Sequence, residues 1–131
     1  MGDMDVLSSR ILLRPTDAAR SRHFYGTVLG LAVSREFGPH DDPGTVYFLG
    51  NGLLEVSGRS DATTASPMEL WMQVRDVGAE FARLERAGVT VLRPPRQEPW
   101  GLIEGWIADP DGVRIVLVQI PEDHPIRRDQ R

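Results

Sequence analysis

Carboxylate, arginine and tryptophan side chains recur on short strand-like segments of this 131-residue chain. Glu69 and Trp71 lie in the run ELWMQV, and Glu104 and Trp106 lie in the run EGWIA. Because neighbouring side chains of a strand point to opposite faces, residues two apart share a face. Each run therefore places a carboxylate and an indole on one side of a sheet. Such a mixture of charged and aromatic side chains is typical of a small-molecule site.

The composition excludes several kinds of chemistry. The chain has no cysteine, and its fifteen basic side chains other than histidine are all arginine. Thiolate nucleophiles, disulfides, lysine Schiff bases and phosphate-loop lysines are therefore ruled out. A net charge of −4 gives no reason to expect nucleic acid or an anionic membrane as a partner. No apolar run is long enough to span a bilayer and the amino terminus is polar, which predicts a cytoplasmic protein.

The first half of the chain predicts a strand, a helix and three further strands. RILLRPT is strand-like, and Asp17 directly after it is a good helix N-cap. Apolar residues at helical spacing follow as far as Gly30, which favours the end of a helix. LAVSREF is the next strand. TVYFL and LLEVS flank a Gly-Asn-Gly sequence centred on Asn51, which predicts a hairpin.

The second half repeats this order. ELWMQVR is a strand closed by Asp76, and apolar residues at helical spacing lead to Gly88. VTVL, EGWIA and RIVLVQ are the following strands, with RPPRQEPWG as a loop and DPDG as a turn. The sequence thus predicts one α+β domain, residues 1–131, with two βαβββ modules whose curved mixed sheets surround a cavity. We place module 1 at about 8–57, a linker at 58–67, module 2 at about 68–120 and a charged, frayed tail at 121–131.

Strand alternation assigns side chains to the two faces of each sheet. A sheet cannot bury its apolar face alone, so each module's helix should cover one face. Toward the helices we expect Ile11, Leu13, Leu54, Val56, Leu70, Met72, Val74, Ile115 and Leu117. Toward the cavity we expect Arg10, Leu12, Arg14, Tyr47, Glu55, Glu69, Trp71, Gln73, Glu104, Trp106, Arg114 and Val116.

Three segments carry a resemblance to a known family: RPTDAARSRHFYGTVLGLAV, QVRDVGAEFARLERAGV, and PWG followed by WIADPDG. Together they resemble the vicinal oxygen chelate superfamily, which includes glyoxalase I, extradiol dioxygenases, fosfomycin-resistance enzymes and bleomycin-resistance binding proteins. The resemblance extends from about residue 10 to residue 119. It implies the glyoxalase/bleomycin resistance/dioxygenase fold and a homodimer.

The resemblance also points to four positions at which metal-using members hold a divalent ion. Here they are occupied by Arg10, Glu55, Glu69 and Val116, and only Glu55 is the family's usual residue. Valine offers a metal no lone pair, and arginine stays protonated and repels a cation. We therefore expect no metal and no other cofactor. Arg10 should instead lie near Glu55 and Glu69, either as a structural ion pair or as an anchor for a ligand.

The remaining candidates are aromatic or titratable side chains. The three tryptophans suit stacking against a planar ligand, although each could simply fill volume. His23, His40 with Asp41 and Asp42, and His124 are weaker candidates. Glu55 and Glu69 are the only catalytic candidates, and an adjacent Arg10 would oppose their use as general bases. Expected ligand contacts are Arg10, Arg14, Tyr47, Glu55, Glu69, Trp71, Gln73, Trp100, Trp106, Arg114 and Val116.

The sequence therefore favours a metal-free binding protein of the bleomycin-resistance type. Its ligand would be a small aromatic or zwitterionic molecule, and its role would be sequestration of a drug or metabolite. A metal-dependent lyase, isomerase, dioxygenase or thiol transferase of the same superfamily is the alternative, and a degenerate interaction domain is a second one. The expected partners are a small molecule and a second copy of the chain.

Overall fold

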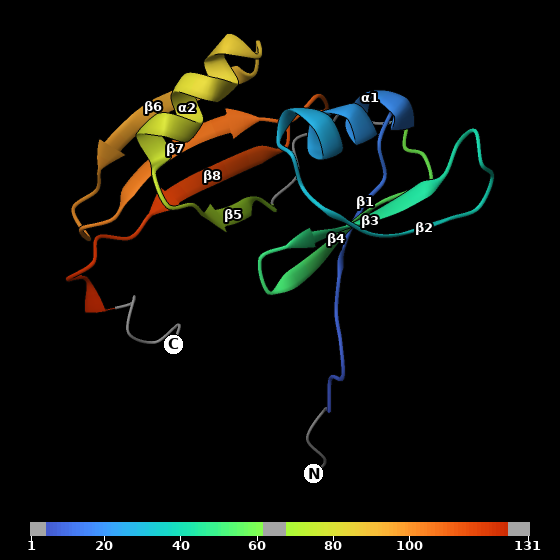
Figure 1. Cartoon of the computed structure of the whole chain (residues 1–131), viewed down its shortest axis with the longest axis horizontal. Coiled ribbons are helices and arrows are strands. Elements are labelled where there is room, and N and C mark those ends of the chain that lie inside the picture. Colours follow the sequence, from blue (N-terminus) through green and yellow to red (C-terminus); the bar gives the residue numbers. More distant parts are fainter. Residues whose placement is uncertain (1–4, 62–67, 126–131) are drawn as a thin grey trace. The chain divides into compact units, whose positions relative to one another are not determined.

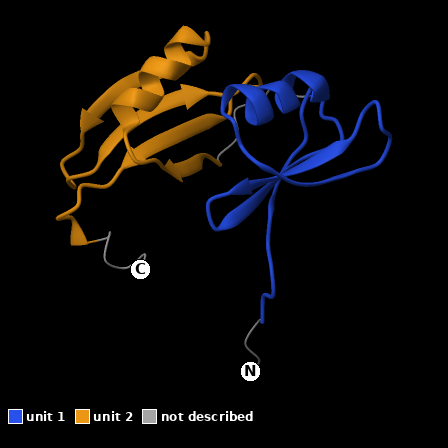
Figure 2. Ribbon diagram, in the orientation of Figure 1, with its two compact units in different colours: residues 1–62 blue, residues 63–131 orange. Residues whose placement is uncertain are grey.

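A computed structural model describes residues 5–61 and 68–125 of the chain. The chain divides into two compact units, residues 1–62 and 63–131 (Figure 2). The division falls inside the expected linker, of which residues 62–67 lie outside the described part. Within the described residues, no helix is both long enough and apolar enough to cross a membrane.

The described part of unit 1 contains four strands, one α-helix and one π-helix. They are β1 (Ile11–Leu13), α1 (Ala18–Arg22), η1 (His23–Val28), β2 (Val33–Phe37), β3 (Gly44–Leu49) and β4 (Gly52–Val56). The strand order is β1-β4-β3-β2, with β1 parallel to β4 and the other pairs antiparallel. The predicted helix begins as expected, because the Asp17 side chain accepts a hydrogen bond from the Arg20 backbone N–H at 3.0 Å. It then widens into a π-helix, in which the Leu29 N–H donates to the Phe24 carbonyl at 2.8 Å.

Unit 2 repeats the arrangement with β5 (Leu70–Gln73), α2 (Val77–Arg86), β6 (Thr90–Gln97), β7 (Ile103–Ala108) and β8 (Arg114–Gln119). The strand order is β5-β8-β7-β6, with β5 parallel to β8. α2 lies across one face of this sheet (Figure 1). The two mixed four-stranded sheets confirm the predicted α+β fold of βαβββ modules.

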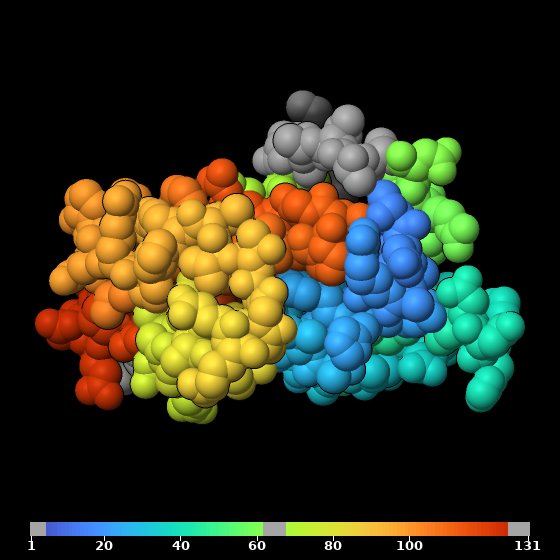
Figure 3. Space-filling view, turned by 90° about the horizontal axis from the view of Figure 1, so that it is seen from above, coloured from blue at the N-terminus to red at the C-terminus, as the bar shows by residue number. Residues whose placement is uncertain are grey.

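The second strand of unit 2 is longer than the sequence predicted. We expected VTVL as the strand and RPPRQ as part of a loop, but β6 runs through both prolines to Gln97. Proline cannot donate to a strand ladder, yet it is tolerated on an edge strand and at bulges. β6 is the edge of its sheet, and its register against β7 shifts twice, between Val91 and Arg93 and between Arg93 and Arg96. In Figure 3 the yellow residues of α2 lie next to the light orange residues of β6.

The helix-facing side of the second sheet is the core of unit 2. Val77, Phe81 and Leu84 of α2 are buried, as are Ile115 and Leu117 of β8. Gly105 provides room for the Phe81 ring, since a Cβ placed there would lie 2.6 Å from its Cε2 atom. The other face carries a second buried cluster of Leu102, Val116, Val118 and Ile120, against which Trp106 packs. The alternation predicted for this sheet is therefore present on both faces.

The segment after β8 differs from the expected frayed tail. Ile120 is fully buried in the second cluster, and the His124 backbone N–H donates to the Pro121 carbonyl at 3.0 Å. The His124 ring nitrogen Nε2 lies 2.8 Å from the Trp100 carbonyl and donates to it. The prediction of fraying is therefore wrong for residues 121–125, because these contacts hold them. Residues 126–131 lie outside the described part.

Candidate functional site

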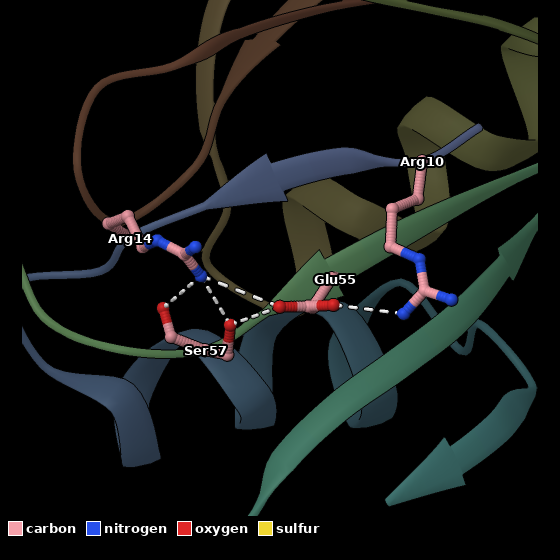
Figure 4. A network of polar contacts seen from close by, with 4 residues as sticks. All are labelled: Arg10, Arg14, Glu55 and Ser57. Carbon is pink, nitrogen blue, oxygen red and sulfur yellow. Dashed lines mark hydrogen bonds and ion pairs between the residues drawn. The ribbon is translucent and has the colours of Figure 1, made fainter.

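In unit 1, two arginines and a serine surround Glu55 (Figure 4). Glu55 pairs with Leu12 across the β1–β4 ladder, so Arg10 and Arg14 flank it along the neighbouring strand. The Arg10 Nη1 atom donates to Glu55 Oε1 at 3.0 Å, and Arg14 Nη1 lies 3.4 Å from Oε2. The Ser57 hydroxyl donates to the same Oε2 at 2.5 Å and accepts from Arg14 Nη1 at 2.5 Å. The predicted contact between Arg10 and Glu55 is confirmed.

These contacts hold Glu55 in its ionised form. The hydrogen bond from Ser57 is the largest cause of a lowered pKa of the Glu55 carboxyl, and the bonds from Arg10 and Arg14 lower it further. Partial burial opposes them by raising the pKa, but the lowering effects prevail. A carboxylate that resists protonation is a poor general base at neutral pH. The geometry thus disfavours Glu55 as a catalytic group.

Glu69 lies in unit 2 and makes an ion pair within its own unit. Its Oε1 atom is 3.1 Å from Arg114 Nη1, and both side chains are close to half exposed. Arg114 belongs to the same sheet as Glu69. The expected approach of Arg10, which lies in unit 1, stays a prediction. A partly exposed ion pair of this kind contributes little to stability.

The face of the second sheet away from α2 carries an aromatic row. Val116 on β8 pairs with Trp71 on β5 and with Trp106 on β7, and Trp106 pairs in turn with Arg93 on β6. Side chains in register across a sheet lie on the same face. The four residues therefore form one row across the sheet, as the predicted alternation of Trp71, Trp106 and Val116 requires. Gln73 lies on the same face, opposite Val118.

The rings of Trp106 and Trp71 differ in what covers them. The Arg93 Cζ atom lies 4.1 Å from the centre of the Trp106 ring, and the Arg114 Cζ atom lies 4.5 Å from it. These cation–π contacts take up the ring surface that a ligand would need for stacking. Trp71, in contrast, is 48% exposed. Of the two strand tryptophans, Trp71 offers the accessible indole.

Trp100 is exposed but held in place. Its indole Nε1–H donates to Glu104 Oε2 at 2.7 Å, and its carbonyl accepts from His124. The turn is closed by the Gly101 N–H donating to the Glu98 carbonyl at 2.9 Å and the Glu98 N–H donating to the Leu102 carbonyl at 2.8 Å. Trp100 nevertheless remains 58% exposed. A rigid, exposed indole loses little conformational entropy when it contacts a ligand.

Sequence reasoning missed three residues of this face. Glu98 is buried and accepts hydrogen bonds from Arg93 and from Arg96, whose Nε atom is 3.4 Å away. Arg93 also donates to the Glu104 carbonyl at 2.8 Å. All three residues were placed in a loop, because Pro94 and Pro95 obscured the strand. No local pattern of the sequence indicated that Arg93 would lie over Trp106.

The prediction that Tyr47 faces the cavity side is wrong. Tyr47 pairs with Leu54, which lies on the helix-facing side, and it is buried. Its hydroxyl donates to the Arg22 carbonyl at 3.3 Å. The ring lies against Gly26 of η1, where an added Cβ would be 3.2 Å from the hydroxyl oxygen. Burial is the main cause of a raised pKa of the Tyr47 phenol, and the residue belongs to the core of unit 1.

The histidines and the polar loop of unit 1 show no arrangement for catalysis. His23 and His40 are exposed, and Asp42 makes an ion pair with Arg22 at 3.0 Å. Within residues 5–61 and 68–125, no group of three or more histidine, aspartate and glutamate side chains is placed to hold a metal ion.

The side chains at the four family metal positions do not suit a metal ion. Arg10 is cationic, and Val116 is a buried side chain without a donor atom. Glu55 and Glu69 each accept a hydrogen bond or ion pair from arginine. A cation would have to displace these guanidinium groups and would find no imidazole ligand. The donor set therefore disagrees with the metal chemistry that other members of the fold support.

Comparison with proteins of known structure gives several similar folds. A glyoxalase-related enzyme from Fulvimarina pelagi is 26% identical, with 90% of this chain and 90% of that chain covered and a TM-score of 0.71. TnmS3, an antibiotic binding protein from Streptomyces sp. CB03234, is 21% identical, with 92% and 100% covered and a TM-score of 0.74. TioX from Micromonospora sp. ML1 is 21% identical, with 86% and 95% covered and a TM-score of 0.71.

The comparison of sequences leads to the same fold. No protein of curated function matches the chain. Residues 8–117 match the family described as the Glyoxalase/Bleomycin resistance protein/Dioxygenase superfamily. That match spans most of the chain and both βαβββ units. The chain therefore belongs to the glyoxalase/bleomycin resistance protein/dioxygenase superfamily.

Proposed function

We propose that this protein binds a small planar aromatic molecule at Trp71, on the face of its second sheet away from α2, without a metal and without chemical turnover. The observation that carries the proposal is the accessible indole of Trp71 beside Val116 in the aromatic row. An exposed indole on a sheet face offers a flat apolar surface on which an aromatic ring can stack. The role would be sequestration of a drug or metabolite.

The surroundings of Trp71 supply the polar contacts that such a site needs. Glu69 and Gln73 are two residues to either side of it on the same strand, so they share its face. Glu69 is tied to Arg114, while Gln73 is exposed. A ring stacked on Trp71 would have an ion pair at one end and an amide at the other. A few polar groups around an apolar platform are the usual composition of a binding site.

Trp100 is a second platform in this proposal. Its indole N–H is bonded to Glu104, which alternates along β7 with Gly105 and therefore lies on the face away from α2. The turn closed by the hydrogen bonds of Glu98 thus places Trp100 on the same face as Trp71. The similarity to TnmS3, whose description is an antibiotic binding protein, supports a binding role by analogy of fold.

The experiment is a titration of ¹⁵N-labelled protein with acridine, 9-anthracenemethanol and 1-naphthalenemethanol, followed through the three indole N–H signals. Replacing Trp71 with leucine keeps apolar volume but removes the flat ring. We expect at least one of these probes to bind about 2- to 12-fold more weakly to Trp71→Leu, from a stacking energy of about 0.5–1.5 kcal/mol. Phe48→Leu, which truncates an exposed aromatic of unit 1, is the control. Unchanged affinity in Trp71→Leu, or an equal loss in Phe48→Leu, would contradict the proposal.

We also propose that the chain forms a homodimer. Each sheet ends in a short edge strand, β1 with 3 residues and β5 with 4 residues. Edge strands expose unpaired backbone groups, and pairing with a second copy is one way to cover them. Light scattering at micromolar concentration should give the mass of two chains. The mass of one chain would refute this proposal.

A further inference from the structure

Unit 1 contains a cluster with more positive than negative charge. Arg10 and Arg14 both approach the single carboxylate of Glu55, so the cluster holds two cations and one anion (Figure 4). Ser57 adds a neutral hydroxyl. The lowered pKa of Glu55 keeps that carboxylate ionised, and the charge of the cluster is therefore +1 at neutral pH. The chain as a whole is negative, so this positive group is a local feature.

Both guanidinium groups retain unused hydrogen-bond donors. Among the described residues, every hydrogen bond and ion pair of the Arg10 and Arg14 side chains is made through Nη1. A guanidinium carries five N–H bonds in a fixed planar arrangement. The Nε and Nη2 donors of Arg10 thus have no partner among residues 5–61 and 68–125. The Arg10 side chain is 36% exposed and that of Arg14 is 47% exposed, so solvent reaches both.

Glu55 fixes the direction of Arg10. The Glu55 side chain is only 12% exposed and is bonded to Ser57 from the same strand region. A carboxylate anchored in this way restrains Arg10 Nη1 and leaves the Nε and Nη2 donors of the guanidinium unused. That preorganisation lowers the entropic cost of binding a further acceptor.

The position and chemistry of Arg10 indicate which chemical groups the cluster could bind. By resemblance, Arg10 occupies the position where metal-using members of the superfamily carry a histidine ligand, and Glu55 occupies their second ligand position. A metal ion and a guanidinium are both cations that attract oxygen atoms, but the guanidinium binds them by donating paired hydrogen bonds. Carboxylate, phosphate and sulfonate groups match that paired geometry.

We infer that unit 1 binds an oxyanion, a carboxylate, phosphate or sulfonate group, through the unused donors of Arg10, with Glu55 and Arg14 as positioning residues. The inference extends the proposed function and does not depend on Trp71, because all the residues that carry it lie in unit 1. The oxyanion can be a free small ion or the acidic group of a larger ligand. Both share the same chemistry at Arg10.

A matched pair of probes tests the inference on the unaltered protein. 1-Naphthoate and 1-naphthalenemethanol have the same ring system and differ mainly in the carboxylate. Calorimetry at low ionic strength should show naphthoate binding about tenfold more tightly, as expected for a charged hydrogen bond. Added sodium chloride should shrink that advantage by screening. Equal binding of the two probes, including no binding of either in the millimolar range, overturns the inference.

Two variants locate the effect. Arg10→Gln removes the charge while keeping a donor for Glu55, and it should bring the ratio of the two affinities to about one. Arg83→Gln, which removes an exposed helix arginine paired with Glu80 at 3.0 Å, should keep the wild-type ratio. An advantage that survives in Arg10→Gln, or that is lost equally in Arg83→Gln, overturns the inference.

Two further measurements distinguish a free oxyanion from an acidic group on a larger ligand, and the oxyanion site from the aromatic platform. Displacement of naphthoate by inorganic phosphate supports a free-ion site at Arg10, and failure of displacement supports an acidic group carried on an aromatic ligand. Because Trp71 lies in unit 2, Trp71→Leu should weaken the binding of 1-naphthalenemethanol and leave the Arg10-dependent binding of naphthoate unchanged. A ratio that depends on Arg10 while Trp71→Leu has no effect would support the oxyanion site and reject the aromatic platform.

Discussion

Glu55→Gln tests whether the charge of Glu55 stabilises unit 1. Glutamine has nearly the same shape and can still accept from Arg10 and donate or accept at Ser57. The substitution therefore removes the negative charge while leaving the packing intact. Arg10 and Arg14, which lie 3.0 and 3.4 Å from the carboxylate oxygens, would lose their counter-ion. The two guanidinium groups would then repel each other without compensation.

The expected loss of stability is modest, because both arginines are partly exposed. A hydrogen bond to a charged group contributes about 1.5–3 kcal/mol, but solvent screening reduces the value for exposed partners. Since glutamine keeps some of the hydrogen bonds, we expect the free energy of unfolding to fall by about 1 kcal/mol. For a chain of this size, that loss corresponds to a decrease in Tm of roughly 3–5 °C.

The stabilisation by the Glu55 charge should depend on pH. Glu55 has a folded-state pKa lowered from its ordinary value of 4.5. A carboxyl with a lowered pKa stabilises the folded state above its ordinary pKa, and that contribution is lost as pH falls through the folded-state value. The difference between wild type and Glu55→Gln should therefore be full at neutral pH. It should shrink once the pH falls below about 4.5.

Thermal unfolding followed by circular dichroism at a series of pH values measures both quantities. Glu80→Gln is the control, since Glu80 makes an exposed pair with Arg83 on α2. Such a pair contributes only about 0.3–0.5 kcal/mol. If Glu55→Gln costs no more than the control, or if its cost is the same in acid as at neutral pH, the assigned role of the Glu55 charge is wrong.

Two further predictions concern unit 2. Gly105→Ala should lower the free energy of unfolding by about 1–3 kcal/mol, because its Cβ would meet the Phe81 ring. In a double-mutant cycle measured by denaturant unfolding, the loss caused by Gly105→Ala should be smaller when Phe81 is replaced with leucine. Glu104→Leu should move the Trp100 indole N–H signal and speed its exchange with solvent, whereas Glu104→Gln, which keeps an acceptor, should change both much less.

The parts of the fold set by local interactions were predictable. Asp17 and Asp76 each cap a helix by accepting from a backbone N–H three residues later, at 3.0 Å in both cases. These bonds depend only on residues close in sequence, so the pattern alone identifies them. Alternation likewise placed Glu55, Trp71, Trp106 and Val116 correctly.

The error at Tyr47 came from the register of a hairpin. Leu49 pairs with Gly52, so the turn consists of Gly50 and Asn51, with Gly50 at a φ of 57°. That two-residue turn places Tyr47 opposite Leu54 and Val46 opposite Glu55. A shift of one residue moves a side chain to the other face. The turn signal was present in the sequence, and counting outward from it gives the right face.

The position of Arg93 could not be obtained in that way. It lies over Trp106 only because β6 passes through two prolines and changes register twice on its way along β7. Each shift depends on pairing with a strand that is distant in sequence, and local propensity argues against a strand there. Long-range pairing overrode local preference, and the residues that cover Trp106 were therefore missed.

The same framework carries different chemistry in the two units. Leu12 pairs with Glu55 in the first, and Trp71 pairs with Val116 at the corresponding place in the second. The first unit thus has a carboxylate that orients arginines, and the second has an apolar side chain beside an open indole. Hydrogen bonding to Arg10 depends on salt, whereas stacking on Trp71 depends on ring area. The two interactions lie in different units and respond to different variables. Substitution of Arg10 should therefore change how ligand affinity depends on salt, and substitution of Trp71 should change how it depends on the size of the aromatic ring.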